Sequence, residues 1–509
     1  MKHDYDVAII GLGPVGSFAA LLLEKRGLKV LAIDKDKDIY SLPRAVSISD
    51  QGLRMAQEVD IDDIYIDNSS ELGGAGFVDE NLKFIGEAIN LKGFTTPNGW
   101  APMRLFHQPY TDKEIRKKIE ETSINTLLHH ELLNVKNRDK DVLFTIKNLE
   151  DSTEVECTSK YLIGADGGSS SLRKLLKISQ EDLHYNRDWV IVDVELTATN
   201  RLEDKAIQVC DPERIGTFIP AHLPFRRWEF IIYEDEDKND FNDDKKIQEL
   251  ISRWLNPSEY KIIRKAIYQF HSVLAHDFRK GNCFLMGDAA HQNPPFMGEG
   301  MMSGYRDAFN LAWKISYVIN NGFSDVLLDS YQEERRPHAK FVVENSAGIG
   351  ELMEAYAQAS DPNEVPKELV AKGYGSFVLP NLSNGLFFGG KANETMHSGE
   401  IFPQPLQYHN SKIVKRMDHI LGSKFCLVSE SKFSVSEENK RFLELLGCKS
   451  LILKKEYIDE NSWLNFFMEQ GKTYLIRPDR YIFGSTTSHV TLNELIDDLK
   501  IRINLENTI

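Results

Sequence analysis

The sequence predicts a composite α/β fold with a Rossmann-like N-terminal unit, an inserted antiparallel β-sheet and a small α/β unit at the C-terminus. Residues 5–34 follow the order strand, glycine turn, helix and strand, which is a βαβ unit. Residues 188–275 hold alternating or β-rich runs such as WVIVDVEL and RRWEFIIYE, separated by loops. Residues 400–509 carry four short β-type runs and a final helix that Thr491 can cap.

The composition is that of a soluble globular protein. The chain has 509 residues, of which 41% are hydrophobic and 27% charged, and about two or three domains are expected at this length. A formal net charge of −16 argues against binding to nucleic acid or an anionic membrane, because both favour an excess of Lys and Arg. We expect neither a signal peptide nor a membrane-spanning helix.

The cysteine pattern indicates a reducing compartment. The five cysteines are scattered along the chain without a CxxC pair. This spacing favours neither a disulfide framework nor a metal cluster, so no metal is expected and the cytoplasm is the simplest location.

The first motif lies inside the βαβ unit. Gly11, Gly13 and Gly16 form a GxGxxG turn between a strand and a helix, and Asp34 ends the second strand. Glycines allow a pyrophosphate close to the backbone, the helix N-terminus offers N–H groups, and an acidic residue here accepts hydrogen bonds from a ribose. The spacing therefore predicts a dinucleotide site, with a purely structural glycine turn as the alternative.

Two later motifs also follow strands and open helices. Residues 164–173 (GADGGSSSLR) place Asp166 at a strand end, where it suits a second contact with phosphate or ribose groups, although an Asp-Gly turn alone is a weak signal. Residues 287–300 (GDAAHQNPPFMGEG) contain Asp288, which can bind a polyol hydroxyl. The turn at Gly298 and Gly300 would aim bare N–H groups at developing negative charge.

The remaining elements are predicted from periodicity. We expect a charged helix over 112–121, a hairpin and strand over 140–165, and a strand over 283–286. A packed helix is expected over 301–320. Helix over 328–358 should break at Pro337, and 359–400 should form a linker wrapped on the body.

Together the three motifs resemble the class A flavoprotein monooxygenases, the family of p-hydroxybenzoate hydroxylase and phenol hydroxylase. Finer details resemble the 3-(3-hydroxyphenyl)propanoate hydroxylase branch. These details are Pro43-Arg44-Ala45, residues 106–109 (FHQP) with Arg116, 210–212 (CDP), 226–230 (RRWEF), 287–314, 331–337 (YQEERRP) and 477–479 (RPD). The resemblance covers essentially the whole chain. Asp112 stands where the branch usually has Glu.

The resemblance implies a division into domains. An FAD-binding domain would comprise 1–70, 100–180 and 280–345, and a substrate-binding β domain 71–99 and 181–279. A helical or linker segment would follow at 346–399. The tail, 400–509, resembles a thioredoxin-like domain but lacks CxxC, so packing or oligomer contacts in a homodimer are expected there rather than dithiol exchange.

The resemblance also implies which residues contact the cofactors. FAD would be held by Gly11, Gly13, Pro14, Val15, Gly16, Asp34, Lys35, Arg44, Ala45, Gln108, Asp166, Gly167, Gly287, Asp288, Pro295, Gly298, Gly300 and Met301. Asp166 and Gly167 belong to a motif associated with both FAD and the reduced nicotinamide. Pro294 and Pro295 would line the reacting face, and His291 is a catalytic candidate that could instead only orient its loop.

The implied reaction is hydroxylation of a phenolic ring, with NADH or NADPH and O2 as co-substrates. NAD(P)H would reduce FAD, O2 would add at the flavin C4a, and the hydroperoxide would pass oxygen to the ring. Some group should take the phenol proton. The candidates are His107, His222, His271, His291, Tyr185 and Tyr233, although side chains of these types are more often structural than catalytic.

The β-rich segment is expected to face the substrate. Its candidate contacts are Gln208, Cys210, Arg214, Trp228 and Phe230. Arg214 or Arg227 could meet a substrate carboxylate, with a surface salt bridge as the alternative. Other readings stay open. They are an oxygenase of a larger polycyclic or quinolone substrate, an FAD-dependent reductase without oxygen insertion, a halogenase or a flavin-binding sensor.

Overall fold

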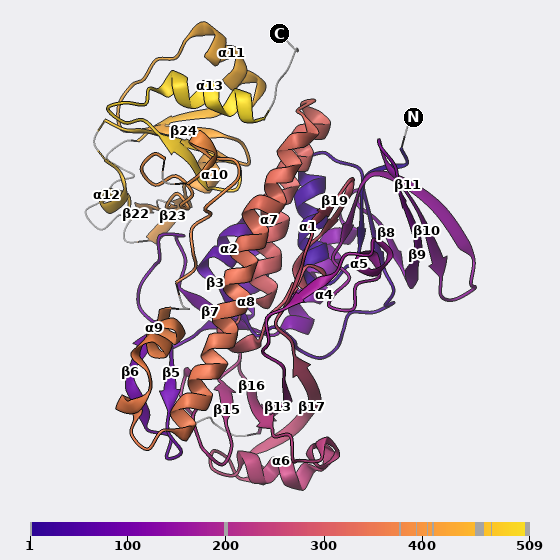
Figure 1. Cartoon of the computed structure of the whole chain (residues 1–509), viewed down its shortest axis with the longest axis vertical. Helices are drawn as coiled ribbons and strands as arrows, with labels where there is room; N and C mark the ends of the chain where they lie inside the picture. Colours follow the sequence, from indigo (N-terminus) through magenta and orange to yellow (C-terminus); the bar gives the residue numbers. More distant parts are fainter. Residues whose placement is uncertain are drawn as a thin grey trace.

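The computed structural model describes residues 3–197, 202–375, 378–392, 394–404, 406–409, 412–453, 463–469 and 471–503. Two long helices, α7 (Gly300–Asn320) and α8 (Asp329–Gln358), run through the middle of the molecule (Figure 1). A large sheet lies beside them, a second sheet lies at one end and the C-terminal unit at the other (Figure 1). The predicted composite α/β architecture is confirmed.

The first sheet has a parallel core built from apolar strands. β1 (Tyr5–Ile10) lies between β2 (Val30–Asp34) and β11 (Glu154–Gly164) and runs parallel to both. Val7, Ala8 and Ile9 are fully buried, as expected for a strand covered on both faces. The other strands are β8 (Asn125–Leu128), β9 (His130–Asn137), β10 (Val142–Asn148), β19 (Arg279–Lys280) and β20 (Cys283–Leu285).

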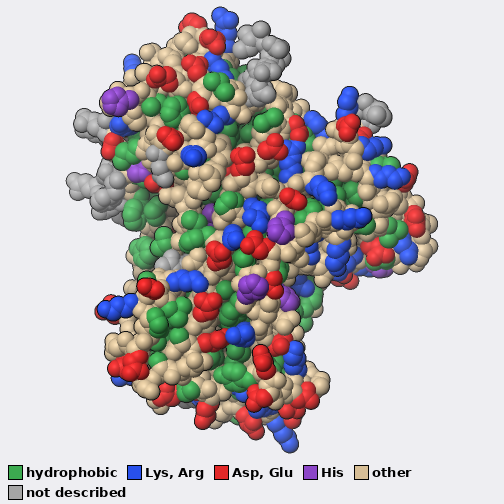
Figure 2. Space-filling model, in the orientation of Figure 1, with side chains coloured by type: hydrophobic (Ala, Val, Ile, Leu, Met, Phe, Trp, Pro, Cys, Tyr) green, Lys and Arg blue, Asp and Glu red, His purple; other side chains and the backbone are tan. Residues whose placement is uncertain are grey.

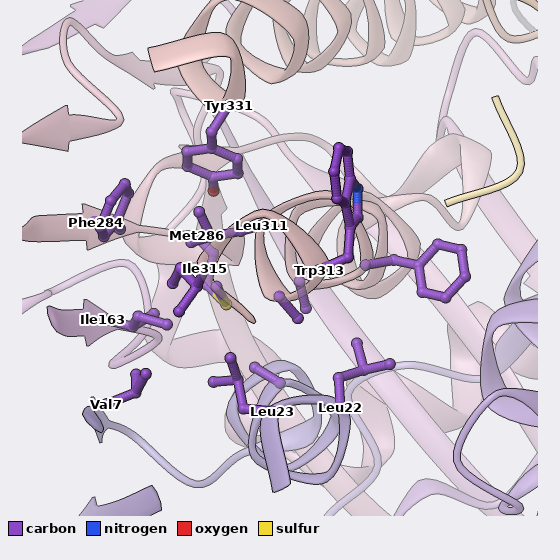
Figure 3. Packing of buried hydrophobic residues seen from close by; sticks show 14 of the residues in the cluster. Val7, Leu22, Leu23, Ile163, Phe284, Met286, Leu311, Trp313, Ile315 and Tyr331 are labelled. Atoms are coloured by element: carbon purple, nitrogen blue, oxygen red, sulfur yellow. The ribbon is translucent and has the colours of Figure 1, made fainter. Parts of the chain in front are cut away.

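Helices cover this sheet with apolar faces. α1 (Pro14–Lys25) buries eight consecutive residues from Gly16 to Leu23. Figure 3 shows Leu22 and Leu23 of α1 below the side chains of α7, Ile315 among them, with Ile163 of β11 alongside. Because α7 is buried almost throughout, its N-terminal turn is held at a fixed place against the sheet. Two further helices are α4 (Gln108–Glu120), which starts four residues before the predicted helix, and α5 (Ser171–Leu175).

The second sheet has seven strands, in the order β17-β13-β16-β15-β14-β5-β6. Its strands are β5 (Gly74–Val78), β6 (Phe84–Asn90), β13 (Arg187–Leu196), β14 (Lys205–Val209), β15 (Gly216–Ile219), β16 (Phe225–Ile232) and β17 (Tyr260–Phe270). One face packs Val192, Phe218 and Trp228 against Ile247 and Ile251 of α6 (Asp244–Ile251). The other face is therefore free to line a cavity.

The expected break at Pro337 is wrong. α8 is continuous from Asp329 to Gln358 with Pro337 inside it. Proline removes one helical hydrogen bond, but the residues around it are anchored from outside the helix. Glu334 and Arg335 pair with buried partners, and His338 is buried. Within the expected linker, the structure adds a helix, α9 (Lys367–Gly375). Positions 376, 377 and 393 of that segment lie outside the described residues.

The C-terminal unit is a four-stranded mixed sheet with helices. The sheet has the order β25-β24-β26-β27, from β24 (Cys426–Ser429), β25 (Lys449–Ile452), β26 (Thr473–Ile476) and β27 (Ile482–Ser485). Its helices are α10 (Asp418–Leu421), α11 (Glu437–Leu445), α12 (Trp463–Phe467) and α13 (Leu492–Arg502). Thr491 caps α13 in a capping box with Glu494, as the sequence predicts. Cys426 and Cys448 are free thiols.

Short elements connect these bodies. They are β3 (Ser47–Ser49), α2 (Asp50–Gln57), α3 (Asp62–Asp67), β4 (Ser69–Glu71), β7 (Met103–Phe106), β12 (Gln180–Asp182), β18 (Val273–Ala275), β21 (His291–Gln292), β22 (Leu406–His409) and β23 (Lys412–Arg416). Acidic and basic side chains are interspersed over the face in Figure 2. Among the described residues, no helix is both long enough and apolar enough to cross a membrane.

Candidate active site

The glycine turn between β1 and α1 is packed tightly against the end of β11. Gly11 has φ +97°, and a Cβ there would lie 2.3 Å from the carbonyl oxygen of Ala165. A Cβ at Gly16 would lie 1.9 Å from the carbonyl oxygen of Gly11. At Gly13, by contrast, a Cβ would meet no protein atom within 4 Å. Gly11 and Gly16 thus shape the turn, whereas Gly13 leaves open space in front of the first turn of α1.

Asp34 fixes the same turn from the end of β2. Its Oδ2 accepts a hydrogen bond of 2.6 Å from the Leu12 N–H, and its Oδ1 accepts one of 2.8 Å from the Asp36 N–H. Arg116 of α4 donates from Nη2 to the Leu12 carbonyl oxygen at 3.0 Å. An acidic and a basic side chain therefore hold the backbone of Leu12 from opposite sides.

Gln108 plays a similar part for the residues around Arg44. Its Oε1 accepts hydrogen bonds from the backbone N–H groups of Arg44 and Ala45, at 2.9 and 2.7 Å. Its Nε2 donates to Oδ2 of Asp112, one turn further along α4, at 3.0 Å. Burial raises the pKa of Asp112 to about 7, against the effect of this hydrogen bond. Asp112 therefore orients the amide that positions Arg44.

The second motif caps a helix and reaches the third. Oδ2 of Asp166 accepts from the backbone N–H groups of Ser171 and Leu172, at 2.7 and 3.1 Å, at the start of α5. Gly167 has φ +77°, a left-handed conformation that favours glycine. Arg173 then donates from Nη1 to the Ala289 carbonyl oxygen at 2.9 Å. This bond links two motifs that lie more than a hundred residues apart.

The third motif is anchored by Asp307 of α7. Oδ2 of Asp307 accepts from the Gly287 N–H at 3.0 Å and lies 2.8 Å from Nε2 of His291. Oδ1 accepts from Nε of Arg335 at 2.8 Å. His291 is 1% exposed and lies outside the cavity lining. The structure thus supports the reading in which His291 orients its loop, and we do not propose it as a catalytic group.

A cavity of about 1560 Å³ brings these motifs together. The predicted residues that line it are Gly11, Gly13, Pro14, Val15, Asp34, Lys35, Arg44, Ala45, Gln108, Asp166, Gly167, Asp288, Pro295, Gly298, Gly300, Met301 and Gln208. Three other predicted residues, Gly16, Gly287 and Pro294, are not part of the lining. Ile401, Phe467 and Tyr481 of the C-terminal part also line the cavity, which the sequence did not predict.

The lining fits an elongated dinucleotide with a diphosphate in its middle. The N-cap of α1 is Gly13, which carries no side-chain cap, so the first N–H groups of this helix face the open space. Asp34 stands beyond this turn, and Arg44 and Asp288 line the cavity as well. The cavity then continues past the turn at Gly298 towards the seven-stranded sheet.

Comparison with known proteins agrees with this geometry. Residues 4–346 match the family described as the FAD binding domain. The chain belongs to this family. The flavoprotein is 28% identical to the 3-(3-hydroxy-phenyl)propionate/3-hydroxycinnamic acid hydroxylase of Escherichia coli K12, over 97% of this chain and 95% of that relative. It is 27% identical to a probable NADH-specific resorcinol 4-hydroxylase of Rhodococcus jostii RHA1, over 97% and 94%.

Solved structures show the same fold for the flavoprotein. The flavin-dependent monooxygenase PieE, in complex with FAD and substrate, superposes with a TM-score of 0.79 at 17% identity and covers 99% of this chain and 100% of its own. Aklavinone-11 hydroxylase, with FAD and aklavinone, gives 0.79 at 20% identity, covering 99% of each chain. The expectation of an FAD-dependent monooxygenase is confirmed.

One wall of the flavoprotein's cavity is a row of side chains from the seven-stranded sheet. Gln208, Thr217, Glu229 and Ile191 are paired across four neighbouring strands and all line the cavity. Thr217 donates from Oγ1 to Oε1 of Gln208 at 2.6 Å. This hydrogen bond leaves the amide NH2 of Gln208 as the group available to a ligand.

Four of the five predicted substrate contacts of the flavoprotein lie elsewhere. Trp228 and Phe230 point to the opposite face of β16 and pack with Trp254. Cys210 is buried in an apolar cluster behind the cavity. Arg214 forms a bidentate ion pair with Glu236 at 2.5 and 2.6 Å. Because side chains alternate along a strand, Trp228 and Phe230 lie on the face of β16 that packs in the core rather than on the cavity side.

Arg227 does line the cavity, but its guanidinium is already engaged. It donates to Oδ1 of Asp193 at 2.7 Å and to the carbonyl oxygens of Pro43 and Arg44 at 2.6 and 2.7 Å. Arg264 shares Asp193 and Pro43 with it. This cluster fixes the loop that carries Arg44, and a substrate carboxylate would have to displace these bonds.

Among the six candidate bases only His271 lines the flavoprotein's cavity. Its Nδ1 lies 3.0 Å from Oδ1 of Asn186. Titratable groups of the seven-stranded sheet that also line the cavity include Tyr268 and Glu229, neither of which was predicted as a base. Burial acts to raise the pKa of Tyr268, but hydrogen bonds with Tyr40 and Arg264 hold it below 10. The alternation in RRWEF, with Arg and Glu on one face and Trp and Phe on the other, is the signal that could have identified Glu229.

Proposed function

We propose that this flavoprotein hydroxylates a phenolic aromatic ring, using NADH or NADPH and O2. The observation that carries the proposal is the continuous cavity, which joins the FAD-type glycine turn at Gly13 to the polar row of Gln208, Thr217 and Glu229. One end fits the cofactor, and the other offers hydrogen-bond partners to a ring hydroxyl within an otherwise largely apolar wall.

The relatives support a phenol as the substrate class. Two of them are named for hydroxylating 3-(3-hydroxyphenyl)propionate and resorcinol, and both compounds carry a ring hydroxyl. The second relative is named as NADH-specific, which favours NADH as the electron donor here. A hydroxyl group makes the ring electron-rich, as attack on an electrophilic oxygen requires.

The residues of this chain bind, orient and exclude water. Bound FAD would supply the two-electron redox chemistry and the activation of O2. The free N–H groups of α1 would hold its diphosphate, and the turn at Gly298 would lie beside its ring system. Pro295, Phe296 and Met297 line the cavity beside this turn and exclude water from the reacting ring. The polar row of the sheet would orient the substrate hydroxyl.

The test is substrate-stimulated consumption of NADH, NADPH and O2 by the holoenzyme. The panel contains resorcinol, 3-(3-hydroxyphenyl)propionate, other simple phenols and hydroxyquinolines, with H2O2 measured in parallel. We expect at least one phenol to accelerate NADH oxidation, with little H2O2 and a product heavier by one oxygen atom. NADH oxidation that no phenol accelerates, or that proceeds without O2, contradicts the proposal and favours an FAD-dependent reductase.

A larger polycyclic substrate is the second candidate. The specific observation is the size of the cavity, about 1560 Å³, with apolar residues such as Phe77, Ile89 and Leu379 around its sheet side. One structural neighbour holds the polycyclic ligand aklavinone. The same assay with anthraquinone-type phenols separates the two. Turnover of these compounds with no response to single-ring phenols would favour the polycyclic class.

Three further predictions belong to the same proposal. They are the domain limits given above, a cytoplasmic location and a homodimer. Light scattering of the purified holoenzyme, read against the 58.1 kDa mass of one chain, measures the last of these.

A further inference from the structure

Glu229 occupies the centre of the substrate wall. It lies on β16, between Thr217 of β15 and Ile191 of β13, and all three line the cavity. Two residues before it on the same face, Arg227 holds the Arg44 loop. Two residues after it, Ile231 packs in the cluster that contains Phe296. Glu229 therefore stands between the residue that holds the Arg44 loop and the apolar cluster that contains Phe296.

The carboxylate of Glu229 is an acidic group of this wall that forms no hydrogen bond with the described part of the protein. Nη1 of Arg227 lies 4.0 Å from its Oε1. The neighbouring side chains are hydrogen-bonded to one another. Thr217 bonds Gln208, and Arg227 and Arg264 both bond Asp193. A carboxylate that is 1% exposed, lines a cavity and has only this long ion-pair contact is suited to accept a hydrogen bond from a ligand there.

The charges around Glu229 come from three strands. Arg227 lies on β16, Asp193 on β13 and Arg264 on β17. Burial raises the pKa of Glu229 to about 7, the two arginines oppose this rise, and Asp193 adds to it. A carboxyl group of this kind changes protonation near neutral pH, which is where an acid–base group transfers protons most effectively.

We infer that Glu229 is the catalytic base of this enzyme, accepting the proton from the hydroxyl group of a phenolic substrate. The inference rests on the proposed function. In this step the O–H bond of the phenol breaks, an O–H bond forms on Oε of Glu229, and the electron pair stays on the phenolate oxygen. The NH2 of Gln208, in the same row, donates a hydrogen bond to that oxygen. Glu229 returns the proton when the product regains its hydroxyl.

Two other titratable groups that line the cavity, His271 and Tyr268, are alternative candidates for the base. His271 is held by Asn186, and the Tyr268 hydroxyl is held by Arg264 at 2.7 Å. Both already have a hydrogen-bond partner in the protein, whereas Glu229 has only the 4.0 Å contact with Arg227. Both also lie near the edge formed by β17, while Glu229 lies in the middle of the sheet face.

The experiment compares Glu229→Gln, Glu229→Asp and His271→Gln with the wild-type holoenzyme over pH 6–10, on the phenol that the wild type hydroxylates best. Glu234→Gln, an exposed carboxylate just beyond β16, is the matched control. The measurements are kcat/KM for product formation, H2O2 release, FAD content and Tm. Glutamine has the shape of a protonated glutamate, and FAD content with Tm verifies the fold of each variant.

We expect Glu229→Gln to lower kcat/KM about 10²–10⁴-fold at pH 7. The inflection near pH 7 should vanish, and activity should recover as the pH approaches the ordinary phenol pKa of about 10, where the substrate ionises in water. A structural role would not produce this recovery. Glu229→Asp should retain the inflection near neutrality at a lower rate, which also decides the matter if Glu229→Gln fails to fold. Glu234→Gln should match the wild type.

Two outcomes overturn the inference, and they are distinguishable. If the wild type hydroxylates phenols and Glu229→Gln keeps the wild-type pH profile, Glu229 is not the base although the proposed function stands. A loss of the inflection in His271→Gln instead would move the role to His271. If the wild type hydroxylates no phenol at all, the proposed function itself fails and the inference fails with it.

Discussion

At the scale of single residues, the side chains of the cofactor motifs also fix the main chain around them. The examples are Asp34, Gln108 and Asp166. Each accepts hydrogen bonds from two main-chain N–H groups, at Leu12 and Asp36, at Arg44 and Ala45, and at Ser171 and Leu172. These bonds exist in the protein alone. The site is thus built before a cofactor enters, and preorganisation of this kind reduces the entropic cost of binding.

Substitutions at two glycines of the first turn should affect folding and FAD binding separately. Gly16→Ala would place a Cβ 1.9 Å from the Gly11 carbonyl oxygen, so we expect a large loss of stability in the apoprotein. Gly13→Ala meets no protein atom and lies at an N-cap, so it should cost at most about 1 kcal/mol. Thermal unfolding of the apoproteins and FAD titration measure the two effects. Gly13→Ala should weaken FAD binding sharply, and unchanged affinity would argue against a diphosphate at this turn.

Glu229 should make stability depend on pH. Its pKa rises from 4.5 to about 7 on folding, so the folded state keeps a proton that the unfolded state has lost between these values. Stability therefore falls as pH rises through this window, by about 3 kcal/mol in total. In the apoprotein, Glu229→Gln should remove this fall and raise the free energy of unfolding at pH 8. Urea unfolding at pH 5 and pH 8 measures the free energy of unfolding at each pH. If this free energy changes equally between the two pH values in the wild type and in Glu229→Gln, the assignment is contradicted.

At the scale of elements, β16 shows how alternation divides stability from binding. On one face of the sheet, Trp228 of β16 is fully buried against Trp254. On the opposite face, Gln208 of β14 lines the cavity. We expect Trp228→Ala to lower the free energy of unfolding by about 3–5 kcal/mol, because it leaves a large cavity. Gln208→Ala should leave Tm nearly unchanged and raise KM for the phenol. Urea unfolding and steady-state kinetics of both variants check this division, and the reverse pattern would contradict it.

Helix α8 shows an element whose continuity depends on its neighbours. By local rules Pro337 should end or kink it. Two residues just before that proline, Glu334 and Arg335, are instead held by α7 and the tail through their buried ion pairs. Tertiary contacts outweigh the loss of one helical hydrogen bond here.

At the scale of the whole molecule, buried ion pairs join the C-terminal part to the rest. Glu334 of α8 bonds Lys314 of α7 at 2.8 Å and Arg477 of the C-terminal part at 2.7 Å, and all three side chains are fully buried. Arg54 of α2 and Arg480 both pair with Asp418. The C-terminal part is thus an integral wall of the cavity, through Phe467 and Tyr481, rather than an appended unit.

Removing the charge of Glu334 should loosen this junction. Glu334→Gln would leave Lys314 and Arg477 without their shared anion, at a cost of about 3–5 kcal/mol. The neighbouring Glu333→Gln, on the exposed side of α8, is the control and should change stability by less than about 0.5 kcal/mol. Urea unfolding and limited proteolysis measure both. Equal stability of the two variants would show that the network does not hold the molecule together.

The same residue predicts acid sensitivity. Burial acts to raise the pKa of Glu334, but the charges of Arg477 and Lys314 with their hydrogen bonds bring it down to about 2, from 4.5. The stabilisation is therefore complete above pH 4.5 and is lost as pH falls towards 2. Acid unfolding of the wild type should be steeper over this range than that of Glu334→Gln, and parallel curves would contradict the assignment.

The sequence by itself determined the local features of this protein. The βαβ unit, the glycine turn at Gly13, the strand that carries RRWEF and the helix that Thr491 caps all follow from periodicity and turn chemistry over a few residues. The tertiary structure alone decided which of these residues share a cavity. It placed Glu229 and Tyr481 on the wall of the cavity and Trp228 in the core. It also paired Arg227 with Asp193. Local patterns report which residues share an element or a strand face, whereas the partner of each face is set by contacts between residues far apart in the chain.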